Sequence, residues 1–139
     1  MSRVMQLCQE RHLRLTALRQ QVLELLWQSA RPMGAYELIN GLGIKSSRAV
    51  APPTVYRTLD FLVTQGFAAK IESRNAYVPC AHPERCHEPI FLICGDCEEW
   101  VELDDLRFEQ QLAEQAAHAG FRATGRVVEV LGTCVDCSA

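Results

Sequence analysis

Residues 52–62 read PPTVYRTLDFL, and this stretch predicts the amphipathic helix around which the fold is built. Proline is favoured in the first turn of a helix, because its missing N–H has no helical partner there. Behind the two prolines, apolar side chains recur at i, i+4, i+7 and i+8 and predict one buried stripe: Val55, Leu59, Leu62 and Val63. We expect Gly66 to end the helix. The outer face near its N-terminal end then presents Thr54, Tyr56, Arg57 and Thr58.

The flanking segments predict three earlier helices and a later hairpin. Thr16 is a favourable N-cap for the second helix, and we expect the third to run from Ala35 to Leu42, closed by the glycines at 41 and 43. After Gly66, residues 67–72 and 76–78 have the pattern of two short strands around a turn at 73–75. This order is that of a winged helix-turn-helix, in which the helix at 52–62 would read DNA.

The outer face of that helix carries side chains suited to DNA. Arg57 can donate two hydrogen bonds to guanine O6 and N7, and Tyr56 can reach a phosphate or a thymine methyl group. The alternative is a solvated helix face that carries an arginine. The hairpin and the positive charge of the surrounding residues favour a double-stranded DNA partner.

Charge and cysteine divide the chain into two halves. Residues 1–78 carry ten Lys/Arg and five Asp/Glu, a balance of +5, whereas residues 79–139 carry four and twelve, a balance of −8. Six of the seven cysteines lie in the second half. We therefore expect a DNA-binding domain at 1–79 and a second domain at 80–139, with a hinge at about 79–88. Neither a membrane span nor a signal peptide is apparent, so we expect a cytoplasmic protein.

Two Cys-x-x-Cys pairs, Cys94/Cys97 and Cys134/Cys137, predict a zinc site. A two-residue spacer lets both sulfurs of one turn face the same ion, and a second turn completes a tetrahedral Zn²⁺ shell. Two redox disulfides are the alternative, which reduced cytosolic thiols disfavour. A closed Cys₄ site has no open position, so its role would be structural.

The remaining pattern predicts an α/β dimerisation domain and an α+β fold class overall. Strands are expected at 89–93, 98–103 and 127–131, with a helix that begins at Asp104-Asp105 and ends at Gly120. Such a small sheet has exposed edges, and pairing across a two-fold axis would cover them. We therefore expect a homodimer.

A second group of potential ligands lies in and near the hinge: Cys80, His82, Cys86, His87 and Glu102. Thiolate, imidazole and carboxylate ligands together suit Zn²⁺, and the thiolates favour zinc over the harder Fe²⁺ or Mn²⁺. Any one of these residues alone would more simply be a solvated side chain.

Three motifs resemble the ferric uptake regulator family: Arg14-Leu15-Thr16-x-x-Arg19, Ala35-Tyr36 and residues 52–62. With the two cysteine pairs, which match the structural zinc site of that family, the resemblance covers nearly the whole chain. Pro-Pro-Thr-Val-Tyr-Arg followed by Leu-Asp-Phe-Leu looks most like the zinc uptake regulator branch. The resemblance implies a dimeric, metal-dependent repressor. It also implies that Tyr36 and Arg57 contact bases and that Tyr56 lies near the DNA backbone.

By the same resemblance, Cys80, His87 and Glu102 match three of the four ligands of a sensory zinc site. The fourth family ligand is a histidine on the wing, and Ala69 stands at that position here. His82 is the favoured replacement and Cys86 the alternative, and a three-coordinate site completed by water is also open. Together with the Cys₄ site this gives two Zn²⁺ per protomer.

These observations predict a zinc-responsive repressor, not an enzyme, that binds palindromic operators of zinc-uptake genes when zinc occupies the hinge site. An iron- or manganese-sensing repressor of the same family is the nearest alternative. From other classes, a thiol- or zinc-dependent enzyme with Cys80 or Cys86 as nucleophile lacks an evident orienting partner. Zinc storage is disfavoured because four cysteines would be committed to structure.

Overall fold

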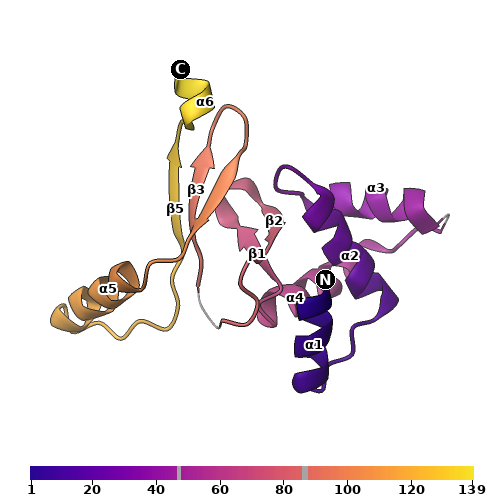
Figure 1. Cartoon of the computed structure of the whole chain (residues 1–139), viewed down its shortest axis with the longest axis horizontal. Helices are drawn as coiled ribbons and strands as arrows, with labels where there is room; N and C mark the ends of the chain where they lie inside the picture. The colour runs from indigo at the N-terminus through magenta and orange to yellow at the C-terminus, as the bar shows by residue number, and fades with distance from the viewer. Residues whose placement is uncertain (47, 86–87) are drawn as a thin grey trace. The chain divides into compact units, whose positions relative to one another are not determined.

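The structure, a computed structural model, describes residues 1–46, 48–85 and 88–139. The chain forms two compact units, Met1–His87 and Glu88–Ala139, and each is described by itself (Figure 1). Cut at this boundary, the sequence keeps a balance of +5 in the first unit and −8 in the second. Among the described residues, no helix is long and apolar enough to cross a membrane.

The first unit is a four-helix arrangement followed by a hairpin, as the sequence predicts. Its elements are α1 (Ser2–Glu10), α2 (Ala17–Gln28), α3 (Ala35–Ser46), α4 (Pro52–Thr64), β1 (Ala68–Ile71), a 3₁₀ turn (Glu72–Arg74) and β2 (Ala76–Pro79). The Thr16 hydroxyl accepts a hydrogen bond from the Arg19 N–H at 3.3 Å, which confirms the predicted N-cap of α2.

Helix α4 supplies the centre of the core of this unit. Val55, Leu59 and Leu62 are fully buried against α2 and α3, which confirms most of the predicted stripe. Val63 was predicted to complete it, but its side chain is 37% exposed. At about 100° per residue, position 63 lies at one margin of the stripe and position 58 at the other. The surrounding residues of the unit bury the margin at Thr58 and leave the margin at Val63 exposed to solvent.

Helix α3 is longer than predicted, because it continues through both glycines to Ser46. A Cβ at position 41 would lie 3.2 Å from Leu25 Cδ1, so the glycine there permits close approach of α2 rather than ending α3. The predicted end at Leu42 is therefore wrong, since helix packing overrides the local glycine signal.

The hairpin matches its prediction closely and gains one partner. Strands β1 and β2 pair antiparallel, with Ala69 opposite Val78, and Asn75 at the turn adopts a left-handed conformation with φ 46°. Met33, in the loop before α3, exchanges two backbone hydrogen bonds with Tyr77, of 3.0 and 2.8 Å. This contact fixes the hairpin to the helical part of the unit.

The second unit is a three-stranded sheet with two helices. Its elements are β3 (Ile90–Cys94), β4 (Trp100–Leu103), α5 (Leu106–His118), β5 (Val128–Gly132) and α6 (Val135–Ser138). The strand order is β4-β3-β5; β3 pairs antiparallel with β4 and parallel with β5. A parallel pair needs a long crossover, and the segment that contains α5 provides it. Helix α5 lies beyond the end of the sheet opposite α6 (Figure 1).

Candidate metal centre and nucleic-acid interface

The four cysteines of the Cys-x-x-Cys pairs converge at the end of the sheet. Their Sγ atoms all lie within 4.8 Å of one another. The Sγ atoms of Cys97 and Cys134 are 3.7 Å apart. Zn–S bonds of about 2.3 Å in a tetrahedron require sulfurs about 3.8 Å apart, so the donor set fits a four-coordinate zinc ion.

Two turns present these sulfurs. The turn after β3 is closed by the Glu98 N–H, which donates to the Cys94 carbonyl at 3.2 Å, while Glu98 itself has φ 64°. The second pair opens helix α6, where the Ser138 N–H donates to the Cys134 carbonyl at 3.0 Å. Because Cys94 and Gly132 are register partners in the parallel pair, the two turns follow the strands at the same end of the sheet.

Hydrogen bonding prepares one of these thiols to ionise. Backbone N–H groups of Cys134, Cys97 and Asp96 lower the pKa of Cys94 to about 6, and the Cys134 N–H lies 3.4 Å from the Cys94 sulfur. Side-chain hydrogen bonds with Cys134, Cys97 and Cys94 raise the pKa of Cys137, and repulsion from the Cys134 thiolate adds to the rise. A bound cation removes that repulsion, and all four sulfurs then ligate as thiolates.

The segment that carries two predicted hinge ligands is held to the first unit. The buried Cys80 follows β2, and its N–H donates to the Phe67 carbonyl at 3.0 Å. Arg11, after α1, donates from Nη1 to the Gln65 carbonyl at 2.8 Å and from Nη2 to the Pro83 carbonyl at 3.2 Å. Its guanidinium also lies over the Phe67 ring, 5.6 Å from the centroid. Sequence patterns did not identify Arg11, because its partners lie 54 and 72 residues away.

His82 is half exposed and faces a carboxylate. Its Nδ1 lies 3.6 Å from Glu84 Oε1. The pKa of Glu84 is lowered, first by its own backbone N–H and then by His82. A carboxylate at Nδ1 orients the ring and leaves Nε2 as the potential metal ligand.

The other predicted members of the hinge site are distributed differently. Cys86 and His87 lie outside the described residues, and Glu102 belongs to β4 of the second unit, opposite Phe91. Ala69, which the family resemblance predicts to stand in place of a wing histidine, is buried in β1. Within the described ranges, the Cys₄ group is the one cluster of three or more potential ligands.

Four of the five predicted DNA-contacting side chains lie near the N-terminal ends of two helices, α3 and α4. Tyr36, in the first turn of α3, is 70% exposed, and Tyr56, near the start of α4, is 42% exposed. Arg57 is exposed and Thr54 is partly exposed. Arg74, at the tip of the hairpin, is an additional exposed cation, which the sequence pattern predicted only as a turn residue.

Thr58 does not belong to this surface. It is buried, with 6% of its surface exposed, and its hydroxyl donates to the Thr54 carbonyl at 2.9 Å. Its predicted place on the outer face is wrong, because it occupies the covered margin of the apolar stripe. The hydroxyl satisfies itself within the helix, as buried threonines commonly do.

The motif residues Arg19 and Phe61 contact each other and stabilise the packing of two helices. The Arg19 guanidinium lies 3.5 Å from the centroid of the Phe61 ring, and its Nη1 donates to the Arg14 carbonyl. This cation–π contact joins α2 to α4, which carries the candidate DNA-reading face.

Comparisons with known proteins agree with this architecture. The model of the ferric uptake regulator family matches residues 10–131. The zinc uptake regulation protein of Escherichia coli (strain K12) is 37% identical over 132 residues, which cover 94% of this chain and 77% of that protein.

Two solved structures are similar over 99% of the chain. The crystal structure of holo XcZur is 43% identical, with a TM-score of 0.89 and 95% of that chain covered. A zinc uptake regulator complexed with zinc and DNA is 35% identical, with a TM-score of 0.92 and 91% of that chain covered.

Proposed function

The chain belongs to the ferric uptake regulator family, and we propose that it is a zinc-responsive transcriptional repressor. The observation that carries this proposal is the similarity, over 99% of the chain, to a zinc uptake regulator complexed with zinc and DNA. The family and these relatives are regulators, which argues against a thiol-dependent enzyme. Acting on chromosomal operators, the protein would work in the cytoplasm.

Double-stranded DNA is the proposed partner of the first unit. The N-terminal end of α4 would enter the major groove, where Arg57 pairs with guanine and Thr54 and Tyr56 contact the backbone or a thymine methyl group. Tyr36 would add a base contact from α3. The unit carries a balance of +5, which favours approach to a polyanion.

The second unit is the proposed dimerisation surface. Large apolar side chains are exposed on all of its elements except β3: Val101, Leu103, Leu106, Phe108, Leu112, Val130, Leu131 and Val135. Exposed apolar surface of this kind marks interaction sites. A homodimer would bury it and set two reading helices at the spacing of a palindromic operator.

We propose two Zn²⁺ sites per protomer. Cys94, Cys97, Cys134 and Cys137 would hold the structural ion. Cys80, His87 and Glu102 would form the sensory site with His82, whose Nδ1 faces Glu84 and whose Nε2 would be the ligand atom; Cys86 is the alternative fourth ligand. The buried Cys80 thiol favours zinc over iron or manganese.

The proposed sensory ligands come from both units, and this is the basis of the switch. Zinc bound there would link the Cys80–His82 segment of the first unit to Glu102 of the second. The link favours one arrangement of the two units among those available to the free protein. If that arrangement is the one that fits the operator, zinc and DNA binding strengthen each other reciprocally.

Arg57→Ala should weaken operator binding about 5- to 150-fold, the loss expected for one bidentate contact to guanine. Discrimination at the contacted base pair should relax at the same time. The measurement is fluorescence anisotropy with the operator and with a variant of that base pair, in excess zinc. Arg3→Ala removes one exposed charge from α1 of the same unit and should change binding little. Equal losses in the two variants would contradict the assignment of Arg57 to base reading.

A metal titration separates this proposal from an iron- or manganese-sensing repressor. Operator binding is measured at matched free concentrations of Zn²⁺, Fe²⁺ and Mn²⁺, with oxygen excluded. We expect half-maximal binding at the lowest free concentration with Zn²⁺. Activation by Fe²⁺ or Mn²⁺ at lower free concentrations would contradict the proposal.

A further inference from the structure

Phe61 is an aromatic side chain on the outer face of α4. At about 100° per residue, positions 54, 57 and 61 fall in one row along the helix, outside its buried stripe. Phe61 thus follows Thr54 and Arg57, two of the proposed DNA contacts, in the same row. Its ring is only partly buried, and the guanidinium of Arg19 lies 3.5 Å from the ring centroid. An arginine therefore covers the aromatic residue one turn beyond Arg57.

Arg19 is itself held at the beginning of α2. Its Nη1 donates to the Arg14 carbonyl, and its backbone N–H donates to the Thr16 hydroxyl at 3.3 Å. The Arg19 side chain is partly buried, and a planar guanidinium can lie flat on an aromatic face. The outer face of α4 is thereby connected, through the Phe61 ring, to the segment before α2.

A second aromatic residue supports the Phe61 ring from the core. Phe67 is fully buried and meets Phe61 edge-on, with centroids 6.5 Å apart and an interplanar angle of 63°. The Arg11 guanidinium lies over Phe67 in turn, 5.6 Å from its centroid. Two cations and two rings thus form one stack, Arg11–Phe67–Phe61–Arg19. All four residues belong to the first unit, and the stack opposes rotation of α4 within that unit.

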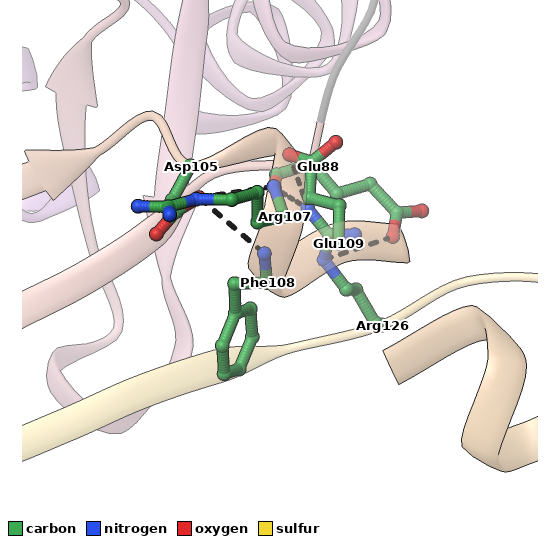
Figure 2. A network of polar contacts seen from close by, with 6 residues as sticks. All are labelled: Glu88, Asp105, Arg107, Phe108, Glu109 and Arg126. Carbon is green, nitrogen blue, oxygen red and sulfur yellow. Dashed lines mark hydrogen bonds and ion pairs between the residues drawn. The ribbon is translucent and has the colours of Figure 1, made fainter. Parts of the chain in front are cut away.

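Arg126 in the second unit shows the more usual way of holding an arginine. Its Nη2 donates to Glu109 Oε1 at 2.9 Å and also to the Glu88 carbonyl (Figure 2). Within the described ranges Arg19 has no carboxylate partner, and the Phe61 ring takes that place. A carboxylate beside the reading row would repel DNA phosphates, whereas a ring holds a guanidinium without adding a negative charge. The Arg19–Phe61 contact therefore suits a DNA-binding face.

Base reading by Arg57 depends on the rotation of α4 about its own axis. A bidentate contact requires the guanidinium plane to meet guanine O6 and N7 with both hydrogen bonds formed together. A group about 6 Å from a helix axis moves about 1 Å when the helix rotates by about 10°. A shift of about 1 Å takes a hydrogen bond out of its favourable range of distances. Contacts that fix this rotation therefore contribute to discrimination between bases.

We propose that Arg19 is a positioning residue for base reading: by stacking on Phe61, it fixes the rotation of α4 that directs Arg57 at its guanine. The inference rests on the proposed function. It gives Arg19 an effect on sequence discrimination without a DNA contact of its own. The contrary interpretations are that Arg19 binds a phosphate directly, or that it only stabilises the fold.

Sequence discrimination separates these interpretations. The probe is a fluorescein-labelled duplex that the wild-type protein selects from a random-sequence pool in excess zinc, together with its single-base-pair variants. The base pair at which Arg57→Ala loses discrimination is the one that Arg57 reads. The test variants are Arg19→Met, Arg19→Lys, Phe61→Leu, which keeps every charge, and the double variant Arg19→Met/Phe61→Leu. Arg3→Met is the matched control, because it removes one exposed arginine from α1 of the same unit. Thermal melting reports stability separately.

We expect Arg19→Met to weaken binding to the selected duplex about 2- to 30-fold, the equivalent of one cation–π contact. Binding to the duplex changed at the base pair of Arg57 should stay close to the wild-type level. Phe61→Leu should give a similar loss, and the double variant should lose no more than either single variant, because the two residues form one contact. Arg3→Met should leave discrimination unchanged.

A loss that is equal on every duplex, persists in the Phe61→Leu background and lowers the salt slope by about 1 would assign Arg19 to a phosphate and overturn the inference. Wild-type discrimination with a lower melting temperature would overturn it as well, since stabilisation alone predicts that result. If Arg19→Met does not fold, wild-type discrimination by Phe61→Leu or Arg19→Lys overturns it instead. Failure of the wild-type protein to select any zinc-dependent duplex would contradict the proposed function itself.

Discussion

Replacing Cys97 with serine is expected to unfold the second unit and, with it, to abolish the proposed dimer. The four sulfurs tie the end of β3 to the end of β5, and structural zinc contributes about 10–16 kcal/mol in small zinc-binding peptides. A unit of roughly 50 residues is stable by only about 3–8 kcal/mol. Its buried apolar side chains, among the described residues, are Ile90, Phe91, Ile93 and Cys94. So small a core cannot offset the loss of the metal.

Circular dichroism and analytical ultracentrifugation measure this outcome. Asp96→Ala is the matched control, because Asp96 lies exposed in the same turn and contributes its backbone N–H, not its side chain, to Cys94. The control should remain a folded dimer with zinc bound. A folded, dimeric Cys97→Ser protein would show that the Cys₄ site is not structural.

Replacing Cys80 with serine should instead abolish the zinc response and leave the fold intact. Serine has nearly the shape of cysteine and keeps the backbone hydrogen bond to Phe67. It removes the thiolate that selects zinc at the proposed sensory site. We expect operator binding to fall, in saturating zinc, to the level of protein without sensory zinc, which is about 5- to 150-fold weaker.

Cys8→Ser is the matched control for this variant. Cys8 is also a buried cysteine of the first unit, 3% exposed against 6% for Cys80, and burial raises its pKa. A hydroxyl there costs stability of the same order, about 1–3 kcal/mol. Operator affinity in zinc should nevertheless stay at the wild-type level. Full zinc stimulation of Cys80→Ser would remove Cys80 from the sensory site.

Local patterns predicted much of the fold. The α4 stripe, the Thr16 cap and the hairpin all follow from spacing or from one residue's conformational preference. The predictions were wrong where tertiary packing, not local sequence, determines the structure. Gly41 lies inside α3 because Leu25 packs against it too closely for a side chain, and Thr58 is buried by its neighbours although its hydroxyl is polar. The short helix α6 was not predicted, because four residues are too few to show a helical periodicity in the sequence.

The candidate sites were predictable to a similar extent. Convergence of the four cysteines followed from their spacing, because a Cys-x-x-Cys turn constrains its own sulfurs. The supporting arginines could not be identified in this way. Arg11 and Arg126 donate to backbone carbonyls 72 and 38 residues away in the sequence. Every residue has a backbone carbonyl, so the type of the accepting residue does not indicate such a contact.

The central claim is that zinc at a second site, separate from the Cys₄ site, controls DNA binding. Its most direct test is operator affinity by fluorescence anisotropy, at free zinc buffered low and then high, with one zinc retained in the Cys₄ site throughout. The account predicts that affinity rises about 5- to 150-fold as a second zinc per protomer binds, which corresponds to a coupling of about 1–3 kcal/mol. Equal affinity at one and two zinc ions per protomer would contradict it.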